Sequence, residues 1–242
     1  MLFLVNQEKK IIFGWSAKCG CSHVKNLFYF LESGVFCESN QSVHRGKGKD
    51  FQQIPENLEE YTLFLFIRNP YKRLVSGFLD KYNPNGEFYS MWNCYPHTFS
   101  NFVNAVLEND QMIDKHHFIP QTGEHFNSQI KIHSNKFIYD IENIDYKHIE
   151  SVFNTIIPKK VIQYRGIHYK NYFQVFLKNV PNLEIEGYYK IKPLLQCFYN
   201  DEIKKKVYHI YKEDFDFFEE NGFDYIRGTK VPPETPSLKK TN

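Results

Sequence analysis

Apolar residues occur along the chain in two kinds of block. The short blocks are continuous apolar runs, typical of strands that are covered on both faces. The clearest are residues 10–15 (Lys-Ile-Ile-Phe-Gly-Trp) and residues 61–67 (Tyr-Thr-Leu-Phe-Leu-Phe-Ile). The apolar start at residues 1–5 predicts the lead-in to a first strand, and residues 136–139 predict a short later strand.

The longer blocks have apolar residues at helical spacing. The first helix is predicted from Ser22 to Gly34, because glycine commonly follows the last helical residue. The second is predicted after Asn69 and Pro70, which suit the N-cap and the first helical position. Further helices with the same spacing are predicted after Thr98, after Asp145 and, as one long helix, over residues 203–215.

Strands that alternate with helices predict an α/β fold of three layers, with a central, mainly parallel, P-loop-like sheet flanked by helices. The 242 residues fit one large domain, which we assign to residues 1–227. Residues 228–242 are polar and contain prolines, so we expect a disordered tail. Ligands of such folds bind at the carboxyl ends of strands, which brings residues 16–23 and 68–76 to one edge.

Composition excludes several classes of protein. With 42% hydrophobic and 17% aromatic residues, the chain is not disordered, and a net charge of +2 argues against a nucleic-acid partner. No apolar stretch approaches the roughly 18 residues of a membrane span, and no secretion signal is recognisable. The odd number of cysteines, five, favours free thiols in a reducing compartment, so we expect a soluble, cytoplasmic protein.

The first candidate segment joins a predicted strand to a predicted helix through small residues. Backbone amides in such a loop, together with the positive end of the helix, suit an anion. Gly20 allows a close approach, Ser22 adds a hydroxyl and Lys18 adds a full charge. The loop is not a Walker A motif, whose lysine follows the last glycine, so a standard nucleotide phosphotransferase is disfavoured. An ordinary turn with a surface lysine is the alternative.

The second candidate segment begins with Arg68, where a buried strand is predicted to emerge. A guanidinium there matches a phosphate group, and Ser76 can add a hydroxyl from the following helix. The alternative is a surface helix with solvated charges. A metal site built on Cys19, Cys21 and His23 is not expected, because no second pair of ligands follows at a suitable spacing.

Together the two segments resemble the donor-binding motifs of sulfotransferases that use 3′-phosphoadenosine 5′-phosphosulfate (PAPS), in particular carbohydrate sulfotransferases of the chondroitin, dermatan and HNK-1 type. Residues 17–25 resemble their 5′-phosphosulfate loop, and residues 68–76 match R-x-P-x-x-R-L-x-S. Further resemblance, in the same order, lies in residues 99–103, 117–121, 138–144 and 211–215. Three departures are Ala17 in place of the usual proline, a short stretch between Lys18 and Arg68, and the missing membrane anchor of the animal enzymes. The missing anchor indicates a microbial or viral setting or a trimmed chain.

The resemblance implies a catalytic domain that moves a sulfuryl group from PAPS to a glycan hydroxyl, releases 3′-phosphoadenosine 5′-phosphate (PAP), and needs no metal. Lys18 would support the bridging oxygen, and Arg68 and Ser76 would hold the 3′-phosphate. The 5′-phosphosulfate would be held by Cys19, Gly20, Cys21, Ser22 and His23.

The base that accepts the proton of the acceptor hydroxyl is left open between His44 and His117, either of which could instead be a surface or structural histidine. A different P-loop phosphotransferase and a non-catalytic nucleotide- or glycan-binding module stay as alternative functions. The identity of the acceptor and the oligomeric state are not predicted.

Overall fold

A computed structural model of the protein describes most of the chain. The described residues are 1–37, 43, 53–92, 96–111, 113–123, 126, 128–164 and 175–226. His44, Cys94 and the predicted tail at residues 228–242 lie outside them.

In the described part of the chain, one sheet is formed by β1 (Leu2–Asn6), β2 (Ile11–Trp15), β3 (Thr62–Ile67) and β4 (Lys136–Asp140), in that spatial order. β1 and β2 form an antiparallel hairpin, whereas β2–β3 and β3–β4 are parallel pairs. The prediction of a mainly parallel sheet is therefore confirmed. Because β2 and β3 are parallel neighbours, the loops that leave their carboxyl ends lie side by side.

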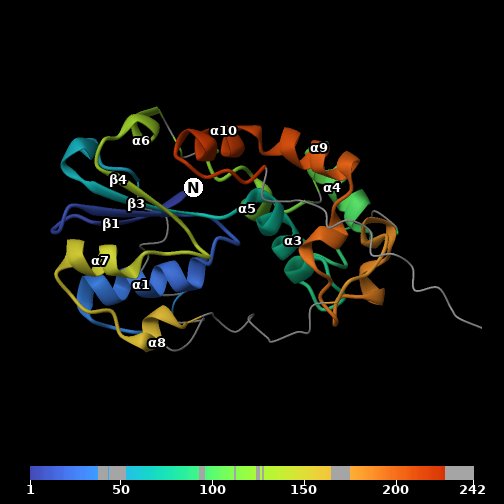
Figure 1. Ribbon diagram of the computed structural model, residues 1–242, viewed down its shortest axis with the longest axis horizontal. Coiled ribbons are helices and arrows are strands. Elements are labelled where there is room, and N and C mark those ends of the chain that lie inside the picture. Colours follow the sequence, from blue (N-terminus) through green and yellow to red (C-terminus); the bar gives the residue numbers. More distant parts are fainter. Residues whose placement is uncertain are drawn as a thin grey trace, which may run out of the picture.

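Helices cover both faces of the sheet (Figure 1). One face packs against α1 (Cys21–Ser33), α7 (Tyr146–Phe153) and α8 (Lys159–Ile162) through Phe13, Phe64 and Phe66. The other face packs against α6 (Ser128–Ile132) and α10 (Lys212–Glu220) through the alternate residues Ile12, Leu63 and Leu65. This alternation of buried residues confirms the three-layer α/β architecture.

A helical part lies beside the sheet and has an aromatic core of its own (Figure 1). Its α-helices are α3 (Pro70–Lys81), α4 (Phe99–Leu107), α5 (Lys115–Phe118) and α9 (Asp201–Ile210). The 3₁₀ turns among the described residues are η1 (Leu58–Glu60), η2 (Val180–Asn182), η3 (Ile185–Gly187) and η4 (Leu195–Phe198). α3 starts directly after β3, so it connects this helical part to the edge of the sheet where β2 and β3 end.

The local signals in the sequence set most helix boundaries. The side chain of Asn69 accepts hydrogen bonds from the amides of Tyr71 and Lys72, at 2.9 and 3.4 Å, and caps α3 as predicted. Thr98 and Asp145 cap α4 and α7, and Gly34 ends α1 with a φ of 71°.

The prediction of one long helix over residues 203–215 is wrong. The chain instead forms two helices, α9 and α10, that meet at Tyr211, whose φ of −112° and ψ of 27° leave the helical region. Tyr211 is buried, and its hydroxyl donates a hydrogen bond of 2.8 Å to the carbonyl of Phe118. A contact with a residue remote in sequence therefore accompanies the break, which is why the spacing of apolar residues did not reveal it.

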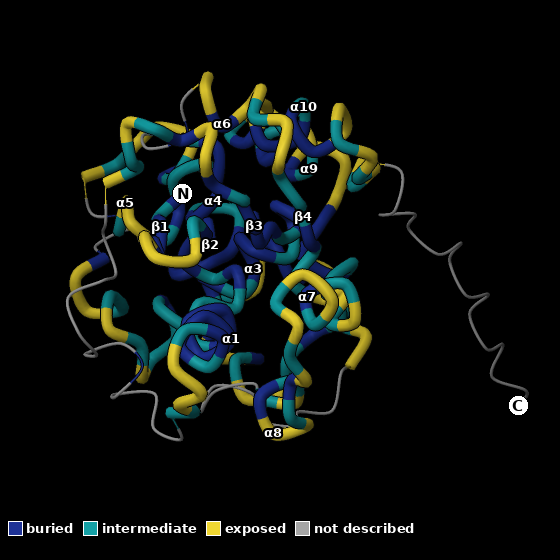
Figure 2. The backbone as a smooth tube through the Cα atoms, turned by 90° about the vertical axis from the view of Figure 1, so that its left-hand side faces the viewer, coloured by how far each residue is buried: buried dark blue, intermediate teal, exposed yellow. Residues whose placement is uncertain are grey.

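Burial is greatest in the strands, which lie between exposed peripheral loops (Figure 2). The cysteines that the structure describes, Cys19, Cys21, Cys37 and Cys197, are free thiols, as expected. Among the described helices, none combines the length and the apolar character needed to cross a membrane.

Candidate functional site

The β2–α1 loop, residues 16–20, has an unusual backbone. Lys18 and Gly20 both adopt left-handed conformations, with φ values of 66° and 65°. A Cβ atom on Gly20 would lie 2.6 Å from Cγ1 of Ile141, so only glycine fits without strain. The amides of Cys19 and His23 are used inside the turn, by Ser16 and Gly20.

Two amides at the start of α1 remain available. Among the described residues, the amides of Gly20 and Cys21 have no hydrogen-bond acceptor, and both lie at the positive end of the thirteen-residue helix α1. Ser22 follows in the first turn of the same helix. This part of the loop is therefore suited to an anion.

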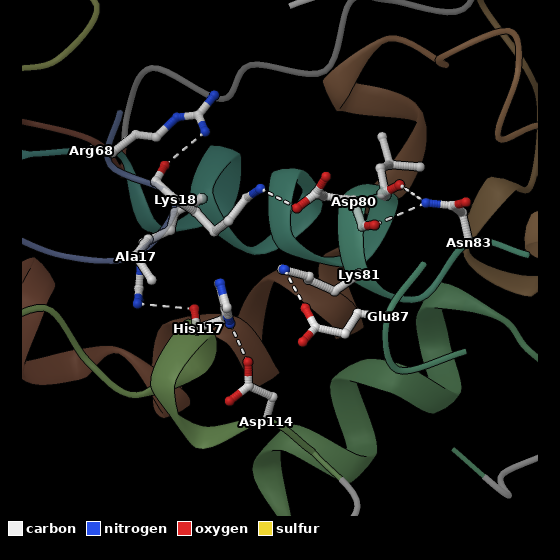
Figure 3. A network of polar contacts seen from close by, with 11 residues as sticks. Ala17, Lys18, Arg68, Asp80, Lys81, Asn83, Glu87, Asp114 and His117 are labelled. Carbon is white, nitrogen blue, oxygen red and sulfur yellow. Dashed lines mark hydrogen bonds and ion pairs between the residues drawn. The ribbon is translucent and has the colours of Figure 1, made fainter. Parts of the chain in front are cut away.

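Lys18 extends from this loop toward α3 (Figure 3). Its Nζ lies 2.9 Å from Oδ2 of Asp80, and the two side chains are only 14% and 23% exposed. Burial lowers the pKa of Lys18 and outweighs the opposing effect of the Asp80 carboxylate. Asp80 was not predicted, because nothing in the local sequence marks a partner 62 residues away.

Arg68 lies at the end of β3, as predicted, and is joined to the β2–α1 loop. Its Nη1 donates to the carbonyl of Lys18 at 3.0 Å, while its backbone amide and carbonyl both bond to the side chain of Gln121. Its Nη2 lies 3.6 Å from the Glu142 carboxylate, which also pairs with Lys72. In the described part of the chain, the buried Nε of Arg68 has no partner.

Ser76 and Arg73 lie on α3 but have different surroundings. Ser76 is partly exposed and lies one helical turn before Asp80. Arg73 is only 2% exposed, and each of its three guanidinium nitrogens donates a hydrogen bond inside the protein. It donates to the carbonyl groups of Ala17, Ile119 and His117, at 2.9, 2.8 and 3.0 Å.

Arg73 thus fixes the β2–α1 loop against α5, a role that the sequence did not suggest. The guanidinium also lies over the ring of Tyr211, with its central carbon 5.9 Å from the ring centroid. In Figure 3 the segment that carries Ala17 and Lys18 and the segment that carries His117 lie on adjoining sides of the site. Two motif-like segments far apart in sequence are therefore held together by one buried cation.

His117 belongs to α5, a single short turn of helix. Its Nδ1 pairs with the Oδ2 atom of Asp114, the N-cap residue of α5. The backbone amide of Asp114 donates to the Tyr82 hydroxyl at 3.0 Å. Burial alone would raise the pKa of Asp114, but its hydrogen bond and ion pair with His117 outweigh burial and hold the pKa below its usual value.

Of the other two predicted histidines, the structure describes His23 and not His44. The ring of His23 is engaged on both sides, through Nδ1 with the carbonyl of Tyr164 at 3.0 Å and through Nε2 with the hydroxyl of Tyr146 at 2.8 Å. His23 is buried, so its side chain faces the protein interior. His44 lies outside the described residues.

Cys19 also faces the interior. Its Sγ donates to Oε1 of Gln121 at 2.9 Å, and burial raises the pKa of the thiol to about 11. The thiol is therefore protonated near neutral pH and serves packing rather than nucleophilic chemistry. In the part of the chain that the structure describes, no group of three His, Cys, Asp or Glu side chains could hold a metal ion.

Gln121 and Asp214 form the buried support of the site. Gln121 is completely buried and bonds to Cys19 and to both backbone groups of Arg68. Asp214, on α10, accepts from the amides of Gln121 and Thr122 and from the Thr122 hydroxyl, at 2.9, 2.7 and 2.8 Å. The only sequence signal for this contact was the resemblance of residues 117–121 and 211–215 to family motifs, which gave no hint that the two segments touch.

Comparison with known proteins finds relatives among the carbohydrate sulfotransferases. The human protein named carbohydrate sulfotransferase 9 is 33% identical over 94 residues, which cover 35% of this chain and 21% of that protein. The mouse protein named carbohydrate sulfotransferase 8 is 31% identical over 94 residues, covering 35% of this chain and 22% of that protein. The matched segment thus spans about a fifth of these curated relatives. No solved structure matches the chain.

The family-level match is much longer than these pairwise ones. A model described as the sulfotransferase family matches residues 1–221, which include β1 to β4, the β2–α1 loop, α3, α5 and α10. The chain therefore belongs to the sulfotransferase family, whose members are PAPS-dependent transferases.

Proposed function

We propose that the protein transfers a sulfuryl group from PAPS to a hydroxyl group of a carbohydrate. The observation that carries the proposal is the junction of the two strand-end segments, where Arg68 Nη1 bonds to the carbonyl of Lys18 at 3.0 Å. The carbohydrate acceptor is inferred from the two relatives described above, which are named carbohydrate sulfotransferases.

The residues at this edge fit a doubly phosphorylated donor. The buried Nε of Arg68 has no partner among the described residues, and a buried donor of this kind favours a ligand oxygen. Arg68 and Ser76 would hold the 3′-phosphate, which distinguishes PAPS from nucleotides without it. Within the predicted segment from Cys19 to His23, the amides of Gly20 and Cys21 and the Ser22 hydroxyl would hold the 5′-phosphosulfate, since the Cys19 and His23 amides are bonded inside the turn.

Lys18 carries the electrostatic part of the mechanism. When bound, PAPS supplies the sulfuryl group and leaves as PAP. The Lys18 ammonium would neutralise the charge that develops on the departing bridging oxygen, and a positioned cation of this kind contributes about 3–4 kcal/mol to the transition state. For Lys18 to do this, its Nζ must move away from Asp80, its partner at 2.9 Å.

The acceptor hydroxyl loses a proton during transfer, and His44 and His117 are the candidates for the base. His117 is close to the donor segments, because Arg73 bonds both to its carbonyl and to that of Ala17.

The four described cysteines are free thiols, which is consistent with a reducing compartment.

Titration calorimetry with PAP tests donor binding. Wild-type protein should bind PAP, and Arg68→Ala should weaken binding at least about tenfold, since a charged hydrogen bond contributes roughly 1.5–3 kcal/mol. Lys10→Ala is the matched control, because the Lys10 side chain is 42% exposed, pairs with Glu60, and lies before β2 at the opposite edge of the sheet. Absence of PAP binding, or equal binding by Arg68→Ala, contradicts the proposal.

Transfer of labelled sulfate from PAPS to a panel of neutral and uronic-acid-containing oligosaccharides tests the reaction. Lys18→Ala should lower kcat by about 10²–10³-fold while the protein stays folded. Binding of PAP without transfer to any oligosaccharide, lipid or peptide acceptor would favour a non-catalytic binding module.

A further inference from the structure

The pair formed by Asp114 and His117 is largely buried and held in place, unlike a chance contact at the surface. The two side chains are only 16% and 19% exposed, and the backbone of each residue is held by further hydrogen bonds. The Asp114 amide donates to the Tyr82 hydroxyl at 3.0 Å, and the His117 carbonyl accepts from Arg73 at 3.0 Å. The His117 amide closes the turn on the Asp114 carbonyl at 3.2 Å.

The two oxygens of Asp114 have separate partners. Oδ1 accepts from the amide of His116 at 3.1 Å, and Oδ2 pairs with Nδ1 of His117. Because an ionised carboxylate only accepts hydrogen bonds, the proton between them in the neutral ring must belong to Nδ1. The neutral imidazole is therefore fixed as the Nδ1–H tautomer, and its Nε2 carries a lone pair that can accept a proton.

The location of His117 gives that lone pair a use. In the part of the chain that the structure describes, Nε2 of His117 has no hydrogen-bond partner. Figure 3 shows the His117 ring directed toward the region of the Lys18–Asp80 pair rather than away from the site. The contrast with His23 is sharp, because both ring nitrogens of His23 are engaged inside the protein.

We propose that Asp114 is a positioning residue that fixes the tautomer of His117 and makes His117 the base of the reaction. This inference rests on the proposed sulfotransferase function. His117 Nε2 takes the proton of the acceptor hydroxyl, and the acceptor oxygen forms the new bond to sulfur. The bond between sulfur and the 5′-phosphate oxygen breaks, and PAP leaves with that electron pair. Asp114 stabilises the resulting imidazolium, which then loses its proton to water.

The competing explanation is that Asp114 only caps α5. Asparagine distinguishes the two roles, because it caps helices as well as aspartate does. In Asp114→Asn the side-chain oxygen can still accept from the His116 amide, but the amide group that faces Nδ1 is a donor. It therefore favours the Nε2–H tautomer of His117, which cannot accept the proton. The same Asp→Asn exchange in the catalytic triad of serine proteases lowers kcat about 10⁴-fold, because it leaves the histidine in the wrong tautomer.

Two measurements test the inference. Long-range ¹H–¹⁵N NMR of full-length protein should show His117 as the Nδ1–H tautomer in wild type and as the Nε2–H tautomer in Asp114→Asn. In sulfate transfer from PAPS to the acceptor found in the oligosaccharide panel, Asp114→Asn should lower kcat about 10²–10⁴-fold with little change in KM. The double variant with His117→Ala should be no slower than His117→Ala alone. Asp145→Asn, which alters the equivalent cap of α7, should keep wild-type kcat.

The outcomes separate this inference from the proposed function. A wild-type His117 in the Nε2–H form, or an Asp114→Asn kcat within about threefold of wild type, overturns the role of Asp114. Loss of transfer in His44→Ala together with retention in His117→Ala also overturns it, while the sulfotransferase function stands. If wild-type protein transfers no sulfate and binds no PAP, the proposed function fails, whatever the tautomer is.

Discussion

Replacing Arg73 with lysine should damage both the stability of the protein and its binding of PAP. The Arg73 guanidinium joins the β2–α1 loop, at Ala17, to the α5 segment, at His117 and Ile119. These partners lie 44 to 56 residues away along the chain. Lysine preserves the charge but has a single nitrogen, so it cannot reproduce the planar fork of arginine.

The size of the effect follows from the three hydrogen bonds. Each bond from a charged donor contributes about 1.5–3 kcal/mol, and a lysine ammonium in the same place can keep one of them. The other two carbonyl groups lose their donor, although water can enter at the partly open edge. We therefore expect a loss of about 2–4 kcal/mol in the free energy of unfolding, or roughly 4–16 °C in Tm for a chain of this size.

Urea unfolding followed by circular dichroism measures the stability, and titration calorimetry with PAP measures the effect on the site. Lys72→Met is the matched control, because Lys72 is the preceding residue of α3, is 39% exposed, and pairs with the surface carboxylate of Glu142. The control should change stability by less than about 1 kcal/mol. The reasoning is refuted if Arg73→Lys is as stable as the control, or if it is unstable yet binds PAP with wild-type affinity.

Three further predictions follow from the same geometry. Gly20→Ala should lower the free energy of unfolding by about 1–3 kcal/mol more than Gly34→Ala does. Both glycines have a positive φ, but only a Cβ atom at position 20 would clash with Ile141. Equal losses of stability in urea unfolding would exclude that clash. Asp80→Asn should tighten PAP binding about fivefold in calorimetry, since it removes the carboxylate that competes with PAP for Lys18. Weaker binding would show that Asp80 contributes to donor binding instead. The pKa of Asp114 is lowered in the folded state, so the ionised carboxylate stabilises the fold above the unfolded pKa of about 3.9, and this stabilisation is lost as the pH falls further. The difference in unfolding free energy between wild type and Asp114→Asn should therefore shrink between pH 5 and pH 2. A constant difference would contradict the ion pair.

Sequence reasoning predicted those features that depend on neighbouring residues. Asn69 and Thr98 cap helices because their side chains reach amides two or three residues ahead, a contact visible in the sequence itself. The continuous apolar run of β3 predicted a strand covered on both faces, and alternate residues of β3 do enter different clusters of the core. The positions of Lys18 and Arg68 at one sheet edge followed from the same reasoning.

The partners of these residues were not predictable, because they are remote along the chain. Asp80 lies 62 residues from Lys18, and Asp214 lies 93 residues from Gln121. No periodicity or motif encodes such a pair, so the sequence alone did not single out Asp80. The break at Tyr211 was missed for the same reason, since apolar spacing continues through it while its hydroxyl bonds to Phe118.

The charge arrangement at the sheet edge explains how a chain with a net charge of only +2 can hold a polyanion. Lys18 pairs with Asp80, and Arg68 shares Glu142 with the neighbouring Lys72, so both of the cations predicted to bind the donor already have a carboxylate partner. The pairs of Arg68 and Lys72 with Glu142 are 23–39% exposed and are worth about 1 kcal/mol or less. The Lys18–Asp80 pair is more buried, and the cost of removing both charges from water offsets much of its attraction. A donor that carries several charges within reach of the same cations can therefore exchange with the carboxylates at small cost.

Because Asp80 and Glu142 are 23% and 36% exposed, they can turn to solvent when an anion arrives, and repulsion between like charges favours that movement. Under the proposed function, donor binding would then be an exchange of counterions within the site, and the same exchange would free Lys18 to act on the bridging oxygen.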